Sequence, residues 1–259
     1  MEEKALRLSA VFLMILTAVS FVLLPKLPAL HTWEVEAREE RIAEEEFAQS
    51  QVTMQNLKIK EQNEAAGAKG ELSIRLPEGV TGDRIAVSND YVTQTIRVEI
   101  PQADRTYFDS YPVLGNSDYI DGLSYTRQGE MGVIEVTTNK VYELQTEYDA
   151  QNFYFNFLTP HEVYDKVVVI DAGHGGRAVG ANKQGINEKD IDLAIVLKLK
   201  EIFDNSDQNI GVYYTRTDDS NPTFDQRVQL ANKSDADLFI SIHNNSTRSG
   251  RMSGTSGTQ

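Results

Sequence analysis

Three residues that could bind a metal or transfer a proton lie at the ends of predicted strands and helices. His174 follows the apolar run 167–170 within a glycine-rich loop, and His243 follows a second apolar run, 238–242. Glu188 begins the helical pattern that leaves the glycine loop. Two imidazoles and one carboxylate, with a fourth position left for water, are typical of a catalytic zinc site. Such an ion lowers the pKa of bound water to about 7 and polarises a carbonyl oxygen.

The elements that must position these residues alternate between strand and helix from residue 166 onward. Apolar runs predict strands at 167–170, 210–214 and 238–242, and helical spacing predicts helices at 188–203 and 224–233. The residues expected to face the sheet are Ile191, Ala194, Ile195, Leu199 and Ile202 in the first helix, and Val228 and Leu230 in the second. This order implies an α/β domain with a mostly parallel sheet flanked by helices, which binds ligands beyond the carboxyl ends of its strands.

Further polar residues lie near the same strand ends. Asp171 closes the first strand, where it either orients a metal ligand or caps the turn. Arg216 and Arg227 are candidates for substrate contact, although arginines at such positions more often form structural ion pairs. Asn244 and Asn245 follow the last histidine, where they either donate hydrogen bonds to a substrate or form a turn.

The amino-acid composition limits the number of domains, the types of metal ligand and the classes of partner. A chain of 259 residues with 40% hydrophobic residues is long enough for one large or two modest domains with a core. The absence of cysteine excludes disulfides and thiolate chemistry and leaves His, Asp and Glu as metal ligands. A net charge of −14 argues against a nucleic-acid partner.

The N-terminal residues 1–30 are predicted to form a cytoplasmic tail and a transmembrane anchor. From Leu8 to Leu24 the chain has 17 residues without a charge, preceded by Lys4 and Arg7. This length is near the lower limit for a helix that crosses ~30 Å of hydrocarbon, and the preceding basic residues place the N-terminus in the cytoplasm. The alternative is a cleaved signal peptide and a secreted protein. In both cases the remainder functions outside the cytoplasm.

Two regions separate this segment from the α/β domain. Residues 31–70 are acidic and are predicted to form a helical, then flexible, stalk, with a coiled-coil dimer as the alternative. Residues 71–164 contain short alternating runs and turn signals, without a helical stretch, and predict an all-β, sandwich-like domain. Its scattered tyrosines, expected to be half-buried strand residues rather than a sugar-stacking surface, are Tyr107, Tyr111, Tyr119, Tyr125, Tyr142, Tyr148 and Tyr154.

Five ordered blocks make residues 166–259 recognisable. They are DAGHGG at 171–176, NEKDIDL at 187–193, YTRTDD at 214–219, RVQLAN at 227–232 and DLFISIHNN at 237–245. In order and spacing they resemble the zinc-dependent N-acetylmuramoyl-L-alanine amidases of the amidase-3 family. The resemblance implies that His174, Glu188 and His243 bind one Zn²⁺ and that the substrate is peptidoglycan. The preceding β domain resembles, by position and pattern, the AMIN-type wall-targeting domains found upstream of such amidases.

The resemblance also implies a reaction, in which zinc-activated water hydrolyses the amide between N-acetylmuramic acid and L-alanine of the stem peptide. The family uses a second glutamate, downstream of the last histidine, as general base. Residues 244–259 contain no Asp or Glu. We therefore expect residues 165–259 to be the N-terminal part of an incomplete amidase domain, inactive by itself, with the general base beyond Gln259.

Two other functions are compatible with the same residues. One is a non-catalytic wall-binding or regulatory protein with a vestigial amidase domain, and the other is a zinc peptidase that cuts within the stem peptide. The HExxH helix of the commonest zinc proteases is absent. The sequence leaves open whether a protein activator acts on the enzyme.

Overall fold

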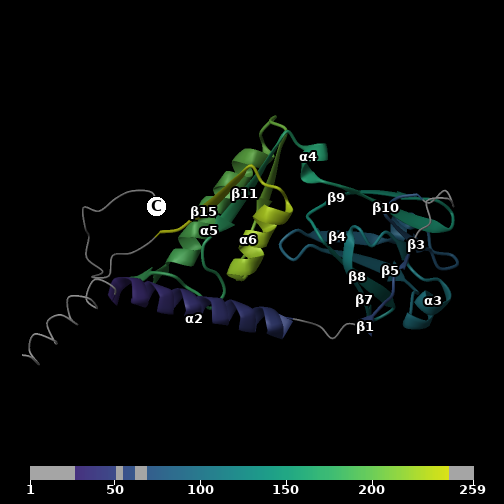
Figure 1. Ribbon diagram of the computed structural model, residues 1–259, viewed down its shortest axis with the longest axis horizontal. Helices are drawn as coiled ribbons and strands as arrows, with labels where there is room; N and C mark the ends of the chain where they lie inside the picture. Colours follow the sequence, from purple (N-terminus) through teal and green to yellow (C-terminus); the bar gives the residue numbers. More distant parts are fainter. Residues whose placement is uncertain (1–26, 51–54, 62–68, 245–259) are drawn as a thin grey trace, which may run out of the picture.

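A computed structural model describes residues 27–50, 55–61 and 69–244 of the chain. These residues form a long helix, a β unit and an α/β unit (Figure 1). The predicted membrane anchor at 8–24 lies outside the described residues. Among the residues that are described, no helix is long and apolar enough to cross a membrane.

The β unit is a sandwich of two five-stranded sheets, as predicted. In order across the first sheet lie β1 (Gln55–Asn56), β7 (Ile120–Gln128), β8 (Met131–Thr138), β5 (Thr95–Pro101) and β4 (Ala86–Asp90). The second contains β2 (Lys60–Glu61), β6 (Leu114–Gly115), β3 (Leu72–Arg75), β10 (Asn152–Leu158) and β9 (Glu143–Tyr148). Alternate residues of β5 and β10, including Ile96, Val98 and Phe155, are buried in one core that both sheets share. Because β1 and β2 belong to these sheets, the unit includes residues that the sequence assigns to the stalk.

The expectation that no helix interrupts the β strands is wrong at α3 (Arg105–Ser110). The Asp104 side chain caps this helix by accepting a hydrogen bond from the Tyr107 backbone N–H, a local signal that the strand pattern obscures. The β unit also contains a 3-10 turn at Gly82–Arg84, and the short helix α4 (Pro160–Val163) leads from it into the α/β unit.

The tyrosines of the β unit serve mainly in packing. Tyr125 and Tyr142 are buried in the shared core, whereas Tyr111 and Tyr148 are exposed. The ring of Tyr148 stacks on Phe153 with a centroid separation of 6.2 Å. The expectation of half-buried strand residues is therefore met only in part, because some of these rings are fully buried and others are exposed.

The α/β unit is built on three parallel strands in the order β14 (Ile210–Tyr214), β11 (Lys166–Ala172) and β15 (Leu238–Ile242). The predicted bounds of the outer two strands and the parallel pairing are confirmed. The central strand β11 is nearly covered on both faces, with Val167, Val169 and Ile170 fully buried. A hairpin of β12 (Asn182–Lys183) and β13 (Ile186–Asn187) precedes helix α5 (Glu188–Asp204), and helix α6 (Phe224–Lys233) precedes β15.

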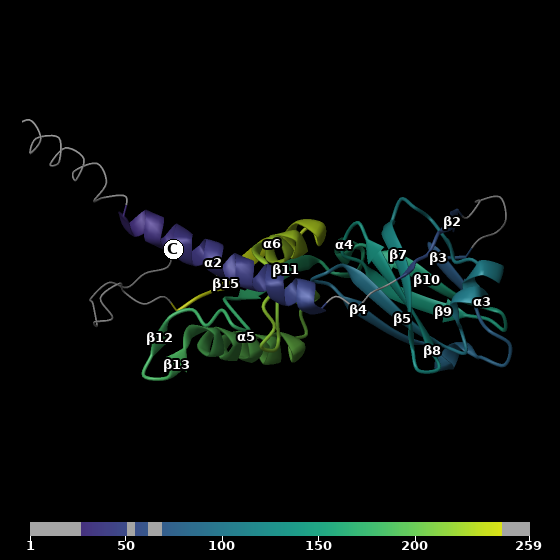
Figure 2. The same ribbon diagram turned by 90° about the horizontal axis from the view of Figure 1, so that it is seen from below.

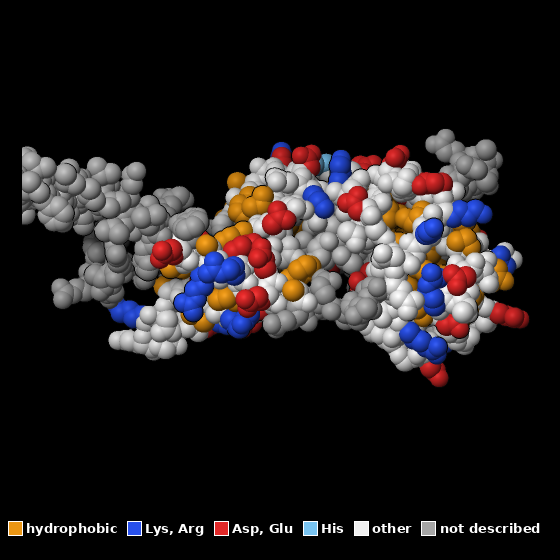
Figure 3. All heavy atoms as spheres, turned by 60° about the horizontal axis from the view of Figure 1, so that its bottom comes forward, with side chains coloured by type: hydrophobic (Ala, Val, Ile, Leu, Met, Phe, Trp, Pro, Cys, Tyr) orange, Lys and Arg blue, Asp and Glu red, His pale blue; other side chains and the backbone are white. Residues whose placement is uncertain are grey.

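Helix α5 follows the predicted face only in part, since Leu199 packs against the sheet core as predicted but the three isoleucines do not. Ile191, Ile195 and Ile202 are 39%, 38% and 65% exposed, whereas Glu188 and Asp192 are 3% and 0% exposed. The buried stripe begins with these two carboxylates and continues with the fully buried Val196. Polar partners at the carboxyl edge of the sheet compensate the burial of the carboxylates. The isoleucines remain at the surface, and Figure 3 shows apolar side chains exposed among charged ones on the face that the helix presents.

Helix α6 partly follows the prediction. Leu230 is fully buried, but Val228 is 53% exposed, so the expected inward position of Val228 is wrong. Arg227, one residue earlier, is 5% exposed instead. The guanidinium can occupy this buried face because hydrogen bonds described below satisfy its donors.

The β and α/β units share an apolar contact. Val141 of the β unit packs with Val169 and Tyr213 of the sheet. The Glu143 carboxylate accepts hydrogen bonds from the hydroxyls of Tyr91 and Tyr213 at 2.9 and 2.6 Å. This interface fixes the side of the α/β unit opposite to the exposed face of α5.

The long helix α2 (Leu27–Ser50) confirms the predicted helix in the acidic region. It crosses the α/β unit, as seen from below in Figure 2. Its side chains reach loops at the carboxyl ends of the strands. The prediction of a solvated stalk did not anticipate these contacts.

Candidate metal centre

His174, Glu188 and His243 converge at the carboxyl edge of the sheet. His174 lies just after β11, His243 just after β15, and Glu188 at the first position of α5. The Nε2 atom of His174 lies 3.1 Å from Nδ1 of His243, and each of these atoms lies 3.3 Å from Oε1 of Glu188. The predicted constellation is therefore a compact triangle of donor atoms.

The size of this triangle suits a zinc ion. Tetrahedral sites with bonds of ~2.0–2.2 Å place their ligand atoms about 3.3–3.5 Å apart. The three separations, 3.1, 3.3 and 3.3 Å, are close to that value. Nitrogen and carboxylate oxygen donors match the ligands that zinc prefers. The donor set thus fits one zinc ion with three protein ligands.

Glycines leave the space that the ligands occupy. A Cβ at Gly173 would meet the imidazole ring of His243, and one at Gly180 would lie 2.6 Å from Cδ2 of His174. His174 itself has φ of 59°, a left-handed conformation that is uncommon for a residue with a side chain. The glycine loop expected from the sequence therefore serves to bring two histidine rings together.

The Glu188 carboxylate is held by backbone donors on both oxygens. The Ala181 N–H donates to Oε2 and the Asn244 N–H donates to Oε1, both at 2.8 Å. Asn244, predicted to contact a substrate or form a turn, instead donates its side-chain amide to Asp192 Oδ1 at 2.7 Å. Asn245 lies outside the described residues.

Asp192 belongs to the same cluster although sequence reasoning did not select it. It lies one helical turn after Glu188 and could have been found by that i, i+4 spacing. Its side chain is fully buried, and its Oδ2 atom has no hydrogen-bond partner. Burial raises the pKa of Asp192, the Asn244 hydrogen bond lowers it, and the charge of Glu188 raises it further. A polar atom buried without a partner next to three ligand atoms is consistent with a cation at this place.

Electrostatics couple the ionisation of His174 to that of Glu188. Burial lowers the pKa of His174, but hydrogen bonds and charges of Glu188 and Glu39 outweigh this effect and raise the pKa to about 9. Burial alone would raise the pKa of Glu188, yet hydrogen bonds from both histidines and Ala181 hold it well below its usual range. The carboxylate is therefore ionised at neutral pH, as a metal ligand must be.

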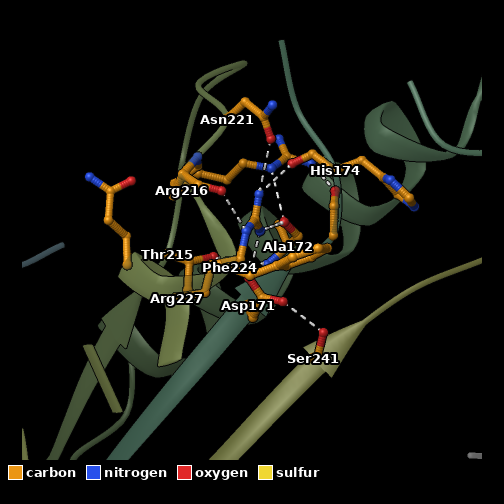
Figure 4. A network of polar contacts seen from close by, with 12 residues as sticks. Asp171, Ala172, His174, Thr215, Arg216, Asn221, Phe224, Arg227 and Ser241 are labelled. Atoms are coloured by element: carbon orange, nitrogen blue, oxygen red, sulfur yellow. Dashed lines mark hydrogen bonds and ion pairs between the residues drawn. The ribbon is translucent and has the colours of Figure 1, made fainter. Parts of the chain in front are cut away.

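Asp171 does not contact either histidine ring. Its carboxylate accepts hydrogen bonds from Thr215 Oγ1, Ser241 Oγ and Arg227, at 2.6, 2.6 and 2.7 Å, and so ties together all three strands and α6 (Figure 4). Burial would raise the pKa of Asp171, but the Arg227 charge and these hydrogen bonds keep it below its usual value. Asp171 thus acts on the metal centre through the strands that it joins.

The two arginines hold the backbone of the ligand loop. Arg227 donates to the carbonyl oxygens of Ala172 and His174 at 2.7 and 2.8 Å (Figure 4). Arg216, also buried, donates to the carbonyls of Ala172 and Gly173 at 3.0 and 2.7 Å. A buried guanidinium that donates to several carbonyl oxygens of one loop fixes the conformation of that loop. Both arginines therefore have the structural role that the sequence analysis gave as the more frequent one.

Helix α2 adds a residue that sequence reasoning missed. Oε2 of Glu39 lies 2.9 Å from Nδ1 of His174. The two residues are 135 positions apart, and no motif joins them. Only the position of α2 across the carboxyl edge of the sheet brings them together.

Comparison with known proteins identifies relatives of this region. Residues 168–258 match the family model described as N-acetylmuramoyl-L-alanine amidase. The chain is 45% identical over 86 residues to an endolysin of Bacillus phage SPP1, covering 33% of this chain and 31% of the relative. It is 41% identical over 78 residues to the N-acetylmuramoyl-L-alanine amidase CwlM of Bacillus licheniformis, covering 30% and 31%.

A solved structure is also similar to part of the chain. The catalytic domain of CwlV, an N-acetylmuramoyl-L-alanine amidase from Bacillus (Paenibacillus) polymyxa var. colistinus, is 41% identical with a TM-score of 0.31. The match covers 32% of this chain and 47% of that one. The chain spans about a third of the length of the curated relatives described above.

Proposed function

We propose that this protein is a zinc-dependent N-acetylmuramoyl-L-alanine amidase that hydrolyses peptidoglycan. The observation that carries the proposal is the triangle of His174, Glu188 and His243 donor atoms, set within residues 168–258 that match the amidase family model. Relatives named as amidases share about 40% identity over this region, which supports the same reaction class. The substrate bond would be the amide between N-acetylmuramic acid and L-alanine.

The residues of the site have distinct tasks in this proposal. His174, Glu188 and His243 hold the ion, and the buried arginines fix the carbonyls of the loop that carries His174. Backbone N–H groups of Ala181 and Asn244 keep the carboxylate ionised and oriented. A bound zinc ion would supply a Lewis acid and lower the pKa of a water molecule.

The proton transfers of this reaction also require a general base. The resemblance to the amidase-3 family places this glutamate on a strand after the last histidine, and we propose the same arrangement here.

The other parts of the chain would bring the enzyme to its substrate. We propose that the β unit binds the cell wall, in the manner of AMIN-type domains, and that the apolar segment at 8–24 anchors the protein in the membrane with its N-terminus in the cytoplasm. The acidic composition agrees with a partner other than nucleic acid.

The test of this function is product analysis with the full-length gene product. We expect digestion of purified peptidoglycan to release stem peptides with a free L-alanine amino group, and His243→Ala to abolish this release. Mass spectrometry identifies the cleaved bond. Products cut within the stem peptide would instead indicate a zinc peptidase, and tight wall binding without cleavage would indicate a non-catalytic binding protein.

A further inference from the structure

The face of helix α2 turned toward the metal centre is acidic and closely packed. Glu39, Glu40, Ala43 and Glu46 follow one another at helical spacing, so they lie on one side of the helix. Ala43 is only 2% exposed, which shows that the helix approaches the α/β unit closely at its middle. The acidic residues beside it are therefore partly buried against the α/β unit.

Two of these carboxylates attach the helix to loops beside the site. Glu46 Oε1 accepts hydrogen bonds from the backbone N–H and the Nε–H of Arg177, both at 3.1 Å. Glu40 Oε2 accepts a hydrogen bond at 2.8 Å from the N–H of Phe224, the first residue of α6, where the helix dipole favours a negative charge. These contacts fix the position of α2 on both sides of His174.

Glu39 uses the fixed helix to contact His174. Its carboxylate is 18% exposed and the imidazole 12% exposed, so the 2.9 Å contact is largely shielded from water. An ionised carboxylate only accepts hydrogen bonds, so the Nδ1 atom of His174 must carry the proton. The opposite ring atom, Nε2, is the one that points at Glu188 and His243.

We propose that Glu39 is a positioning residue of the metal centre, which makes helix α2 part of that centre. The inference rests on the proposed zinc site. A carboxylate that accepts the Nδ1–H bond fixes the tautomer and orientation of a metal-binding histidine and increases its basicity. Glu39 does this from an element outside the 168–258 region that matches the amidase family model.

The test compares zinc affinity, by chelator competition, among variants of the full chain. We expect Glu39→Ala to weaken zinc binding by about 10–100-fold, and Glu39→Gln to weaken it less, because its amide oxygen can still accept the hydrogen bond. Glu44→Ala is the matched control, since Glu44 is an exposed glutamate on the same helix. His174→Ala should lose tight binding altogether.

A second readout separates positioning from a general effect on stability. In the zinc-loaded wild-type protein, NMR should show a hydrogen-bonded Nδ1–H proton of His174, shifted downfield, that disappears in Glu39→Ala while unfolding by urea stays close to that of Glu44→Ala. Unchanged zinc affinity in Glu39→Ala, with binding lost in His174→Ala, would overturn the positioning role and leave the proposed function intact. Tighter zinc binding in Glu39→Ala would also overturn it, because α2 would then obstruct the centre. Zinc binding that survives His174→Ala would refute the metal centre itself.

Discussion

Replacing Glu188 with glutamine is expected to reduce zinc affinity by more than 100-fold. This loss exceeds the ~10–100-fold that is typical when a metal ligand loses only its hydrogen-bonding partner. The change removes the one negative charge among the three ligands. In the wild-type protein the backbone N–H groups of Ala181 and Asn244 each donate to one oxygen of the Glu188 carboxylate. In the variant one of these N–H donors would face the amide NH₂ group, which cannot accept its hydrogen bond. Chelator competition measures the affinity.

The control for this prediction is Asp190→Asn. Asp190 lies two residues later in the same first turn of α5 and is exposed, so its substitution removes one charge from the helix terminus without touching the ligand cluster. We expect this variant to bind zinc within a factor of about three of wild type, since exposed charges at a helix end contribute little. If Glu188→Gln bound zinc as tightly as Asp190→Asn, Glu188 would not be a ligand.

Replacing Asp171 with asparagine is expected to cost about 3–5 kcal/mol of unfolding free energy, because it leaves the Arg227 charge buried without its counter-ion. Both side chains are about 5% exposed, and the carboxylate also accepts hydrogen bonds from Thr215 and Ser241. Urea denaturation measures the loss. Lys198→Gln, which breaks an exposed ion pair with Glu201 on α5, is the control and should change stability by less than about 0.5 kcal/mol.

The stabilising effect of Asp171 also has a definite pH dependence. Since the pKa of Asp171 is lower in the folded protein than in the unfolded chain, its contribution is complete above the unfolded value of about 3.9 and is lost as pH falls through the lower folded value. The stability difference between wild type and Asp171→Asn should therefore shrink below about pH 4. A difference that stayed constant down to pH 2 would contradict the assignment.

Local patterns predicted the elements that carry the metal ligands. The strands at 210–214 and 238–242 were predicted with their observed bounds, because short apolar runs between turn residues are a strong strand signal. His174, Glu188 and His243 could be grouped because the ends of parallel strands meet at one edge of a sheet. Topology therefore gave the site without knowledge of any side-chain contact.

Other features depended on contacts that no local pattern contains. The buried face of α5 was predicted from its isoleucines, whereas hydrogen bonds from Asn244 and Ala181 hold Glu188 and Asp192 inward. Arg227 is buried because Asp171, 56 positions away, accepts its hydrogen bond. Glu39 appeared as one of many solvated glutamates, and its contact with His174 arises only from how α2 lies on the α/β unit.

The most direct test of the metal centre is zinc K-edge X-ray absorption on the protein loaded with one equivalent of zinc. We predict a four-coordinate ion with two imidazole nitrogens and oxygen donors at ~2.0–2.2 Å, and loss of one imidazole contribution in His243→Ala. A spectrum without imidazole scattering, or one unchanged in His243→Ala, would contradict the proposed centre.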